Sequence, residues 1–228
     1  MKILVSDFDL TLFDNNYIDN VKVIKKFVED GNIFIIATGR SLFDLKRDID
    51  HYNLPCSYYI CKDASAIYDK DENLIFRCDI NNELAKEIIS YLEKTNIFTD
   101  ILVDNSYEHT NKVNNVNAII AKPIDFVLAN KILDELKKEF KDIDGYISRH
   151  WLNINNIKCN KAFGIDYLVK LNNYNINNVY TIGDTINDYK MIKEYNGYAM
   201  KCADDYIKDV AIDIVNNFDE LMKKIKAD

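Results

Sequence analysis

The 228-residue sequence has little of what marks flexible or disulfide-bonded chains. It contains only 2 prolines and 6 glycines, which argues against long linkers and disordered segments. The 5 cysteines are scattered, form no Cys-x-x-Cys pair and have no accompanying histidine pattern. We therefore expect neither a disulfide framework nor a zinc site, but buried free thiols in a reducing cytoplasm.

Long apolar runs and excess positive charge are also missing. No apolar run approaches the roughly 18 residues of a membrane-spanning helix, and Met1 leads directly into an expected strand, so we expect no signal peptide and no membrane partner. The net charge of −8 disfavours nucleic acid as a partner. Hydrophobic residues make up 48% of the chain, enough for a sizeable core. We expect a monomer or a weak homodimer.

The first part of the chain alternates between strand and helix patterns. Residues 2–5 and 33–37 are apolar runs typical of buried strands. Between them, residues 21–28 have helical apolar spacing, and Gly31 is a typical residue after a helix end. The same alternation of strand and helix patterns returns after Asn160. This pattern predicts an α/β core with a mostly parallel sheet.

The pattern differs between residues 80 and 151. Helical spacing at 84–92 and 124–140 is combined with several short strand signals. Such a mixture is typical of a small antiparallel sheet that carries helices on one face. We therefore expect an inserted α+β domain at 80–151, which divides the core domain into residues 1–79 and 152–228.

Two carboxylates, Asp7 and Asp9, follow the first expected strand. In an extended chain, residues i and i+2 leave on the same face, and the carboxyl ends of parallel strands are where open α/β sheets bind ligands. Carboxylates so close repel each other unless a cation, a proton or a basic side chain lies between them. A solvated acidic turn explains these two residues alone equally well.

Three further polar groups stand at or beside expected strand ends. They are Thr38-Gly39-Arg40, Lys161 at a helix start, and the segment Gly183 to Asp188. Each has a simpler structural interpretation: a strand end, a solvated lysine or a tight turn. Arg40, likewise, would form a surface ion pair with an acid such as Asp44.

Taken in order, DFDLT, ATGR, Lys161 and GDTIND resemble the four motifs of the haloacid dehalogenase-like hydrolases, specifically the Cof-type subfamily IIB. The resemblance covers essentially the whole chain. It implies a Rossmann-like, three-layer α/β/α core with an inserted α+β cap of type C2B. It also implies a Mg²⁺-dependent phosphatase of small phosphate monoesters, with sugar phosphates as the expected class.

The resemblance gives each motif residue an expected role. Asp7 is the expected nucleophile that forms an aspartyl phosphate, and Asp9 the general acid and then base. The expected Mg²⁺ ligands are Asp7, the main-chain carbonyl of Asp9, Asp184 and Asp188. Thr38 and Lys161 complete the expected catalytic set. The expected phosphate-binding residues are Phe8, Thr38, Gly39, Arg40, Lys161 and Asn187.

Two positions depart from the family pattern. Asp63-Ala64-Ser65 stands where the family often has Asn-Gly-Ala, and Lys161 precedes Ala162 instead of glycine. The first departure adds a negative charge to a loop that faces the substrate in the family, so it bears on substrate choice. Weaker candidates for substrate contact lie in the inserted segment and its return to the core: Tyr107, Glu108, His109, Arg149, His150 and Trp151.

Two other functions remain open from the sequence. A phosphomutase of the same superfamily is the alternative enzyme. A non-catalytic binding protein with this fold is the alternative outside enzymes, and the intact motif carboxylates and Lys161 argue against it.

Overall fold

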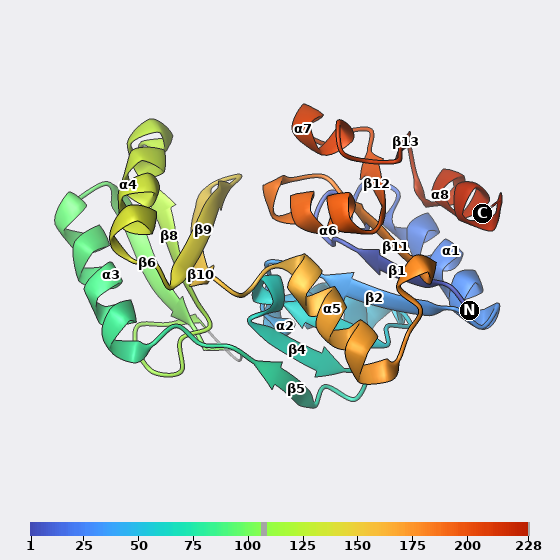
Figure 1. The fold of residues 1–228 in the computed structure, drawn as a ribbon, viewed down its shortest axis with the longest axis horizontal. Coiled ribbons are helices and arrows are strands. Elements are labelled where there is room, and N and C mark those ends of the chain that lie inside the picture. The colour runs from blue at the N-terminus through green and yellow to red at the C-terminus, as the bar shows by residue number, and fades with distance from the viewer. Residues whose placement is uncertain (106–108, 228) are drawn as a thin grey trace.

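The computed structural model describes residues 1–105 and 109–227, which form two lobes (Figure 1). The larger lobe contains an eight-stranded sheet. Its strands are, in spatial order, β13 (Asp213–Val215), β12 (Asn196–Met200), β11 (Val179–Gly183), β1 (Ile3–Ser6), β2 (Ile33–Ala37), β3 (Tyr58–Cys61), β4 (Ala66–Asp69) and β5 (Leu74–Arg77).

The pairing of these strands brings the motif residues to one edge. The strands from β13 to β3 are parallel, whereas β4 and β5 are antiparallel additions. Ser6 at the end of β1 is opposite Ile182 in β11 and Ile36 in β2. The residues that follow these three strands therefore leave the sheet at the same edge, as the position of the motifs after expected parallel strands predicts.

Helices cover both faces of this sheet. α1 (Tyr17–Glu29), α2 (Leu42–Ile49) and α8 (Phe218–Ala227) pack on one face together with Leu4 of β1. α5 (Lys161–Asn172), α6 (Tyr189–Glu194) and α7 (Asp205–Lys208) pack on the other face with Ile3 and Val5. Because β1 is apolar on both faces, it lies inside the molecule, and the prediction of a three-layer α/β/α core is confirmed.

The smaller lobe has an antiparallel sheet with two helices on one face (Figure 1). α3 (Asn82–Thr95) and α4 (Phe126–Glu139) share a hydrophobic core with the inward-facing residues of its strands. These strands are, in spatial order, β7 (His109–Thr110), β6 (Phe98–Asp104), β8 (Ala118–Pro123), β10 (Trp151–Asn156) and β9 (Ile143–Ser148). We refer to this lobe as the cap. The expected α+β architecture of the insertion is confirmed.

The expected boundary at residue 151 needs adjustment. β10 pairs with β8 and β9 through Asn155 and Asn156. A boundary at 151 would separate this strand from the sheet to which it belongs. The sequence shows the apolar alternation of the strand but does not show which strands it pairs with, so it could not place this boundary. We propose that the cap extends from about residue 80 through Asn156.

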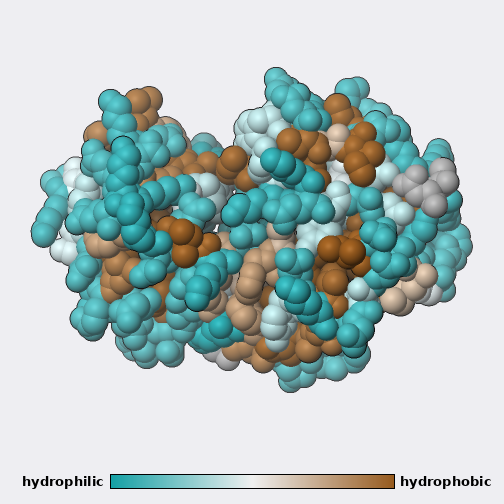
Figure 2. All heavy atoms as spheres, in the orientation of Figure 1, coloured by the Kyte–Doolittle hydropathy of each residue, from teal (hydrophilic) through white to brown (hydrophobic). Residues whose placement is uncertain are grey.

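The surface in the view of Figure 2 is mostly hydrophilic, with smaller apolar patches on both lobes. Among the described helices, none combines the length and the apolar character needed to cross a bilayer.

Candidate active site

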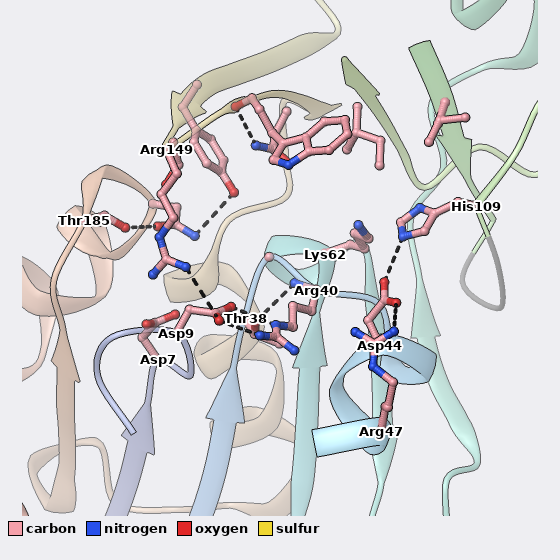
Figure 3. Close-up of a pocket in the computed structure, with 18 residues that line it drawn as sticks. Asp7, Asp9, Thr38, Arg40, Asp44, Arg47, Lys62, His109, Arg149 and Thr185 are labelled. Atoms are coloured by element: carbon pink, nitrogen blue, oxygen red, sulfur yellow. Dashed lines mark hydrogen bonds and ion pairs between the residues drawn. The ribbon is translucent and has the colours of Figure 1, made fainter. Parts of the chain in front are cut away.

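Asp7 stands directly after β1, at the sheet edge where the motifs meet. Its backbone N–H donates to the carbonyl of Ile182 at 2.9 Å, which fixes its main chain against β11. The side chain is buried but lines a cleft of about 540 Å³ between the two lobes (Figure 3). The carboxylate is therefore held by the core and reachable from the cleft.

Lys161 neutralises part of the charge at this edge. Its Nζ lies 2.6 Å from Asp7 Oδ1 and 2.6 Å from Asp188 Oδ1, and its side chain is 0% exposed. Burial alone would lower the pKa of this amine, but the carboxylates of Asp188 and Asp7 outweigh burial and raise it. The alternative of a solvated lysine is thus wrong, and the surrounding carboxylates favour the charged form of Lys161.

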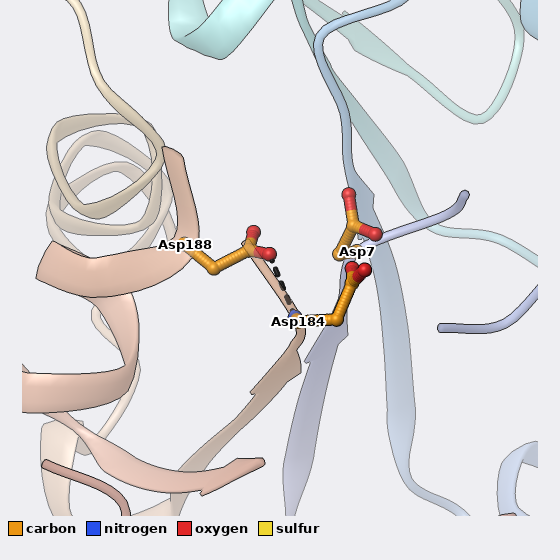
Figure 4. A group of neighbouring side chains, drawn as sticks. All are labelled: Asp7, Asp184 and Asp188. Carbon is orange, nitrogen blue, oxygen red and sulfur yellow. Dashed lines mark hydrogen bonds between the residues drawn. The ribbon is translucent and has the colours of Figure 1, made fainter. Parts of the chain in front are cut away.

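Two of the three carboxylates that converge here contact this lysine, and Figure 4 shows how the three, Asp7, Asp184 and Asp188, lie. One oxygen from each of Asp7, Asp184 and Asp188 lies within 4.8 Å of the others. Asp188 is fixed by the backbone N–H groups of Asp184 at 2.9 Å and Thr185 at 3.1 Å. Thr11, from the first motif, donates its hydroxyl to Asp184 Oδ1 at 3.0 Å. Backbone and hydroxyl donors therefore hold these oxygens together.

Burial and neighbouring charges raise the pKa of Asp7 and of Asp184. Burial raises the pKa of Asp7 well above its usual value, and Asp188 and Asp184 add to the shift, against the lowering effect of Lys161. Burial, and then the charge of Asp188, raise the pKa of Asp184 to about 6. Three acids facing one ammonium leave an excess of negative charge. All three offer oxygen ligands, the donor set preferred by a hard divalent cation, so the residues present fit Mg²⁺.

Asp9 lies beside Asp7 and is held by arginines (Figure 3). Arg40 donates from Nε to Asp9 Oδ2 at 2.8 Å and from Nη2 to Oδ1 at 2.6 Å, and also pairs with Asp48. Arg40 therefore pairs with an acid of α2, as the simpler interpretation expects, but this acid is Asp48 instead of Asp44, and Arg40 also holds Asp9 of the first motif. Arg149, from the turn between β9 and β10, brings Nη1 to 3.6 Å from Asp9 Oδ1. A cap residue therefore reaches the core motif.

The side chain of Phe8 does not face the cleft. It is fully buried in the core and stacks on Phe13 with ring centroids 5.2 Å apart. Arg40 packs over the same ring at 4.9 Å from its centroid. Phe8 thus supports Arg40 through its ring, and its side chain does not offer the expected phosphate contact, which stays a prediction.

Thr38 and Gly39 form another side of the cleft. Thr38 continues the sheet, with its N–H donating to the Ile60 carbonyl at 2.8 Å. A Cβ on Gly39 would lie 3.1 Å from the hydroxyl oxygen of Tyr146, which belongs to the cap strand β9. Gly39 therefore allows the cap to approach this segment closely, a role that the sequence gives no means of seeing.

The cap sheet covers the cleft with the face that carries no helices. Along β10, Leu152 and Ile154 are buried under the helices, whereas Trp151 and Asn153 line the cleft. The same alternation places other cap residues there, namely Leu102, Ile120, Tyr146 and Ser148. Residues that alternate along the cap strands thus form a mixed apolar and polar wall opposite Asp7.

His109 joins the cap to the rim of the cleft. Its Nε2 lies 2.8 Å from Asp44 Oδ2 of α2, and this hydrogen bond is the main reason that the pKa of Asp44 falls to about 2. Its Nδ1 lies 3.5 Å from Asp104, which also pairs with the buried Lys62 at 3.0 Å. The neighbouring candidates Tyr107 and Glu108 lie outside the described residues.

Known sequences and structures resemble this chain over most of its length. The 5-amino-6-(5-phospho-D-ribitylamino)uracil phosphatase YcsE of Bacillus subtilis is 26% identical over 220 residues, which are 92% of this chain and 88% of YcsE. A haloacid dehalogenase-like hydrolase from B. subtilis superposes with a TM-score of 0.84 at 17% identity, covering 99% of each chain. The subclass IIB sugar phosphatase BT4131 superposes with a TM-score of 0.81 at 17% identity, covering 100% of this chain and 98% of that protein.

A model of the haloacid dehalogenase-like hydrolases matches residues 4–115 and 95–221. These matches contain Asp7, Thr38, Lys161 and Asp184, the residues that the fold brings together at one sheet edge. With the sequence match, the α/β core and the cap in agreement, the chain belongs to the haloacid dehalogenase-like hydrolase family.

Proposed function

We propose that this protein is a Mg²⁺-dependent phosphatase that hydrolyses small phosphorylated metabolites through an aspartyl phosphate on Asp7. The observation that carries the proposal is the arrangement of Asp7 itself. It is a buried carboxylate at a strand end, paired with a buried lysine, grouped with two further acids and facing a covered cleft. Such a carboxylate can act as a nucleophile on phosphorus once cations hold it ionised.

The chain supplies the groups for two successive transfers. Asp7 attacks the phosphorus, and the alcohol leaves with a proton from Asp9. Water then attacks the aspartyl phosphate, and Asp9 takes its proton. Arg40 binds both oxygens of Asp9. We therefore propose that Arg40 orients the Asp9 carboxyl group, in addition to its expected role in binding the phosphoryl group. We expect Thr38, which lines the cleft, and Lys161, which contacts Asp7, to bind the phosphoryl oxygens as their charge develops.

Mg²⁺ would be held by Asp7 and Asp184, with Asp188 fixing the loop, and would supply positive charge to the transferring phosphoryl group. We expect about one Mg²⁺ per chain, bound more weakly at pH 5 than at pH 7. The sign follows from Asp184: its pKa of about 6 lies above the usual 3.8, so it holds a proton at pH 5 that must leave before metal binds.

Calorimetric titration at pH 5 and pH 7 measures the stoichiometry and affinity of Mg²⁺ binding. Asp184→Asn is the test variant. Asp205→Asn is its control, because the Asp205 side chain is 98% exposed. In metal-free protein the same raised pKa makes stability fall as the pH rises from about 4 to 6. Full activity after exhaustive chelation, or unchanged Mg²⁺ affinity in Asp184→Asn, would refute the metal site.

The cleft favours small substrates. Its volume of about 540 Å³ suits a metabolite rather than a macromolecule. YcsE, named for a phosphorylated ribityl compound, supports a sugar or sugar-alcohol phosphate as the substrate class. A panel of sugar, sugar-alcohol and nucleotide phosphates assayed with Mg²⁺ tests the proposal. Release of free phosphate is expected, whereas an isomeric sugar phosphate as product would indicate a phosphomutase.

We expect the cap to determine which leaving groups the enzyme accepts. Asn153 lines the cleft from β10, and its Nδ2 donates to the Trp151 carbonyl of the same strand at 3.2 Å. We expect Asn153→Ala to change the relative kcat/KM among sugar phosphates about three- to tenfold, with less than twofold change for p-nitrophenyl phosphate. Asn130→Ala is the control, because Asn130 is an exposed residue of α4. Equal losses on every substrate would contradict a selective cap.

A further inference from the structure

One carboxylate, that of Asp63, connects the cap to the core. Tyr146 of β9 donates its hydroxyl to Asp63 Oδ2, and Asn155 of β10 donates its Nδ2 to the same oxygen at 3.3 Å. On the core side, Asn187 donates its Nδ2 to Asp63 Oδ1 at 3.0 Å. Asp63 is only 4% exposed, so these contacts replace its hydration.

The partners of Asp63 require an acceptor. Asn155 and Asn187 present amide N–H groups, and Tyr146 presents its O–H, whereas an ionised carboxylate only accepts. An asparagine at position 63 would satisfy Tyr146 or one of the amides, but its own NH₂ would face another donor. The acid that departs from the family's usual asparagine therefore matches its surroundings in this chain.

The backbone aims this carboxylate. Lys62, Asp63 and Ala64 have φ values of +47°, +50° and +73°, three consecutive left-handed residues without a glycine. The turn is tied to the second motif, because Lys62 N–H donates to the Arg40 carbonyl at 3.0 Å and Asp63 N–H to the Thr38 carbonyl at 3.2 Å. A turn fixed to the expected phosphate-binding segment thus holds the cap strands.

The junction leaves little free space. Around the position of a Gly39 Cβ lie Tyr146 Oη at 3.1 Å, Asp63 Oδ2 at 3.7 Å and Asn187 Nδ2 at 3.8 Å. Asn187 Nδ2 is also 3.3 Å from the Tyr146 hydroxyl. The hydrogen-bond network around Asp63 therefore reaches Gly39, which lines the same cleft as Asp7.

We propose that Asp63 is a positioning residue that clamps the cap onto the core, holding Tyr146 and Asn155 of the cap against Asn187 of the core. This inference rests on the proposed phosphatase function and adds the Asp63 carboxylate to the contacts of His109, Arg149 and Asp104 that join the cap to the core. Without the clamp, fewer molecules have a closed cap, so substrates that need cap contacts bind more weakly.

The test compares Asp63→Asn, Tyr146→Phe and the double variant. Asparagine suits left-handed backbone as well as aspartate does, so Asp63→Asn keeps the turn, removes the negative charge and replaces one acceptor oxygen by an NH₂ donor. Tyr91→Phe is the matched control, because the Tyr91 hydroxyl also donates to a carboxylate, Glu135 at 2.7 Å, but within the cap.

The first readout needs no substrate. Trp151 is the chain's single tryptophan and lines the cleft. We expect acrylamide to quench its fluorescence more strongly in Asp63→Asn and Tyr146→Phe than in wild type, and Tyr91→Phe to behave as wild type. Equal quenching in all four proteins would overturn the clamp, even if no phosphatase substrate is ever found.

The second readout is kinetic. For a sugar phosphate, we expect KM to rise about tenfold in either single variant with kcat within twofold, and the KM for p-nitrophenyl phosphate, which needs fewer cap contacts, to rise less. Because Asp63 and Tyr146 form one contact, the KM of the double variant should rise no further than that of the more impaired single variant. Additive losses, or equal falls in kcat on both substrates, would contradict the clamp.

Discussion

Asp7→Asn should lower kcat by at least about a thousandfold while the protein stays folded. An amide is a poor nucleophile, and it is a weaker metal ligand than a carboxylate. The change keeps the side chain's size and removes a buried negative charge whose pKa burial already raises. In metal-free buffer we therefore expect a stability equal to or above that of wild type, measured by urea unfolding.

Asp19→Asn provides the control for this variant, because the Asp19 side chain is 70% exposed and lies on α1 away from the cleft. It should retain wild-type activity. If Asp7→Asn kept activity within tenfold of wild type, the role of Asp7 as nucleophile would be excluded. If both variants lost activity equally, the effect would come from a general change in charge.

Lys161→Met should be severely destabilising as well as inactive. The methionine has a similar length but leaves Asp7 and Asp188 without the ammonium that both contact at 2.6 Å. Breaking a buried ion pair by removing one partner costs about 3–5 kcal/mol. The carboxylates would then take up protons in the native state, so the variant should regain stability as the pH falls from 7 to 5.

Urea unfolding at both pH values measures this loss. Lys26→Met is the control, since Lys26 forms an exposed ion pair with Asp30, and such pairs contribute little. A loss below about 1 kcal/mol for Lys161→Met at pH 7 would contradict the structural role assigned to Lys161.

The sequence predicted the core side of the site well. Local apolar patterns located β1, β2 and β11, and the parallel arrangement then required the residues that follow them to meet. Gly31, expected after a helix end, follows α1 with a φ of +85°. These features depend on short segments whose physical signals lie within the segments themselves.

The cap side could not be predicted in the same way. Tyr146 and Asp63 are 83 residues apart, and nothing in either local pattern shows that a cap strand turns its hydroxyl toward that turn. His109 likewise belongs to β7, a two-residue strand too short to give a periodic signal. Contacts between lobes follow from how two sheets face each other, which composition and periodicity do not encode.

The central claim is a covalent aspartyl phosphate on Asp7. Wild-type protein should be mixed with substrate and Mg²⁺, quenched in acid within milliseconds and reduced with borohydride, which converts an acyl phosphate to homoserine. Mass spectrometry of the peptide that contains residues 1–22 should then find homoserine at position 7 and unchanged aspartate at position 9. Modification at Asp9, or phosphate release with no modified residue at any quench time, would contradict the account.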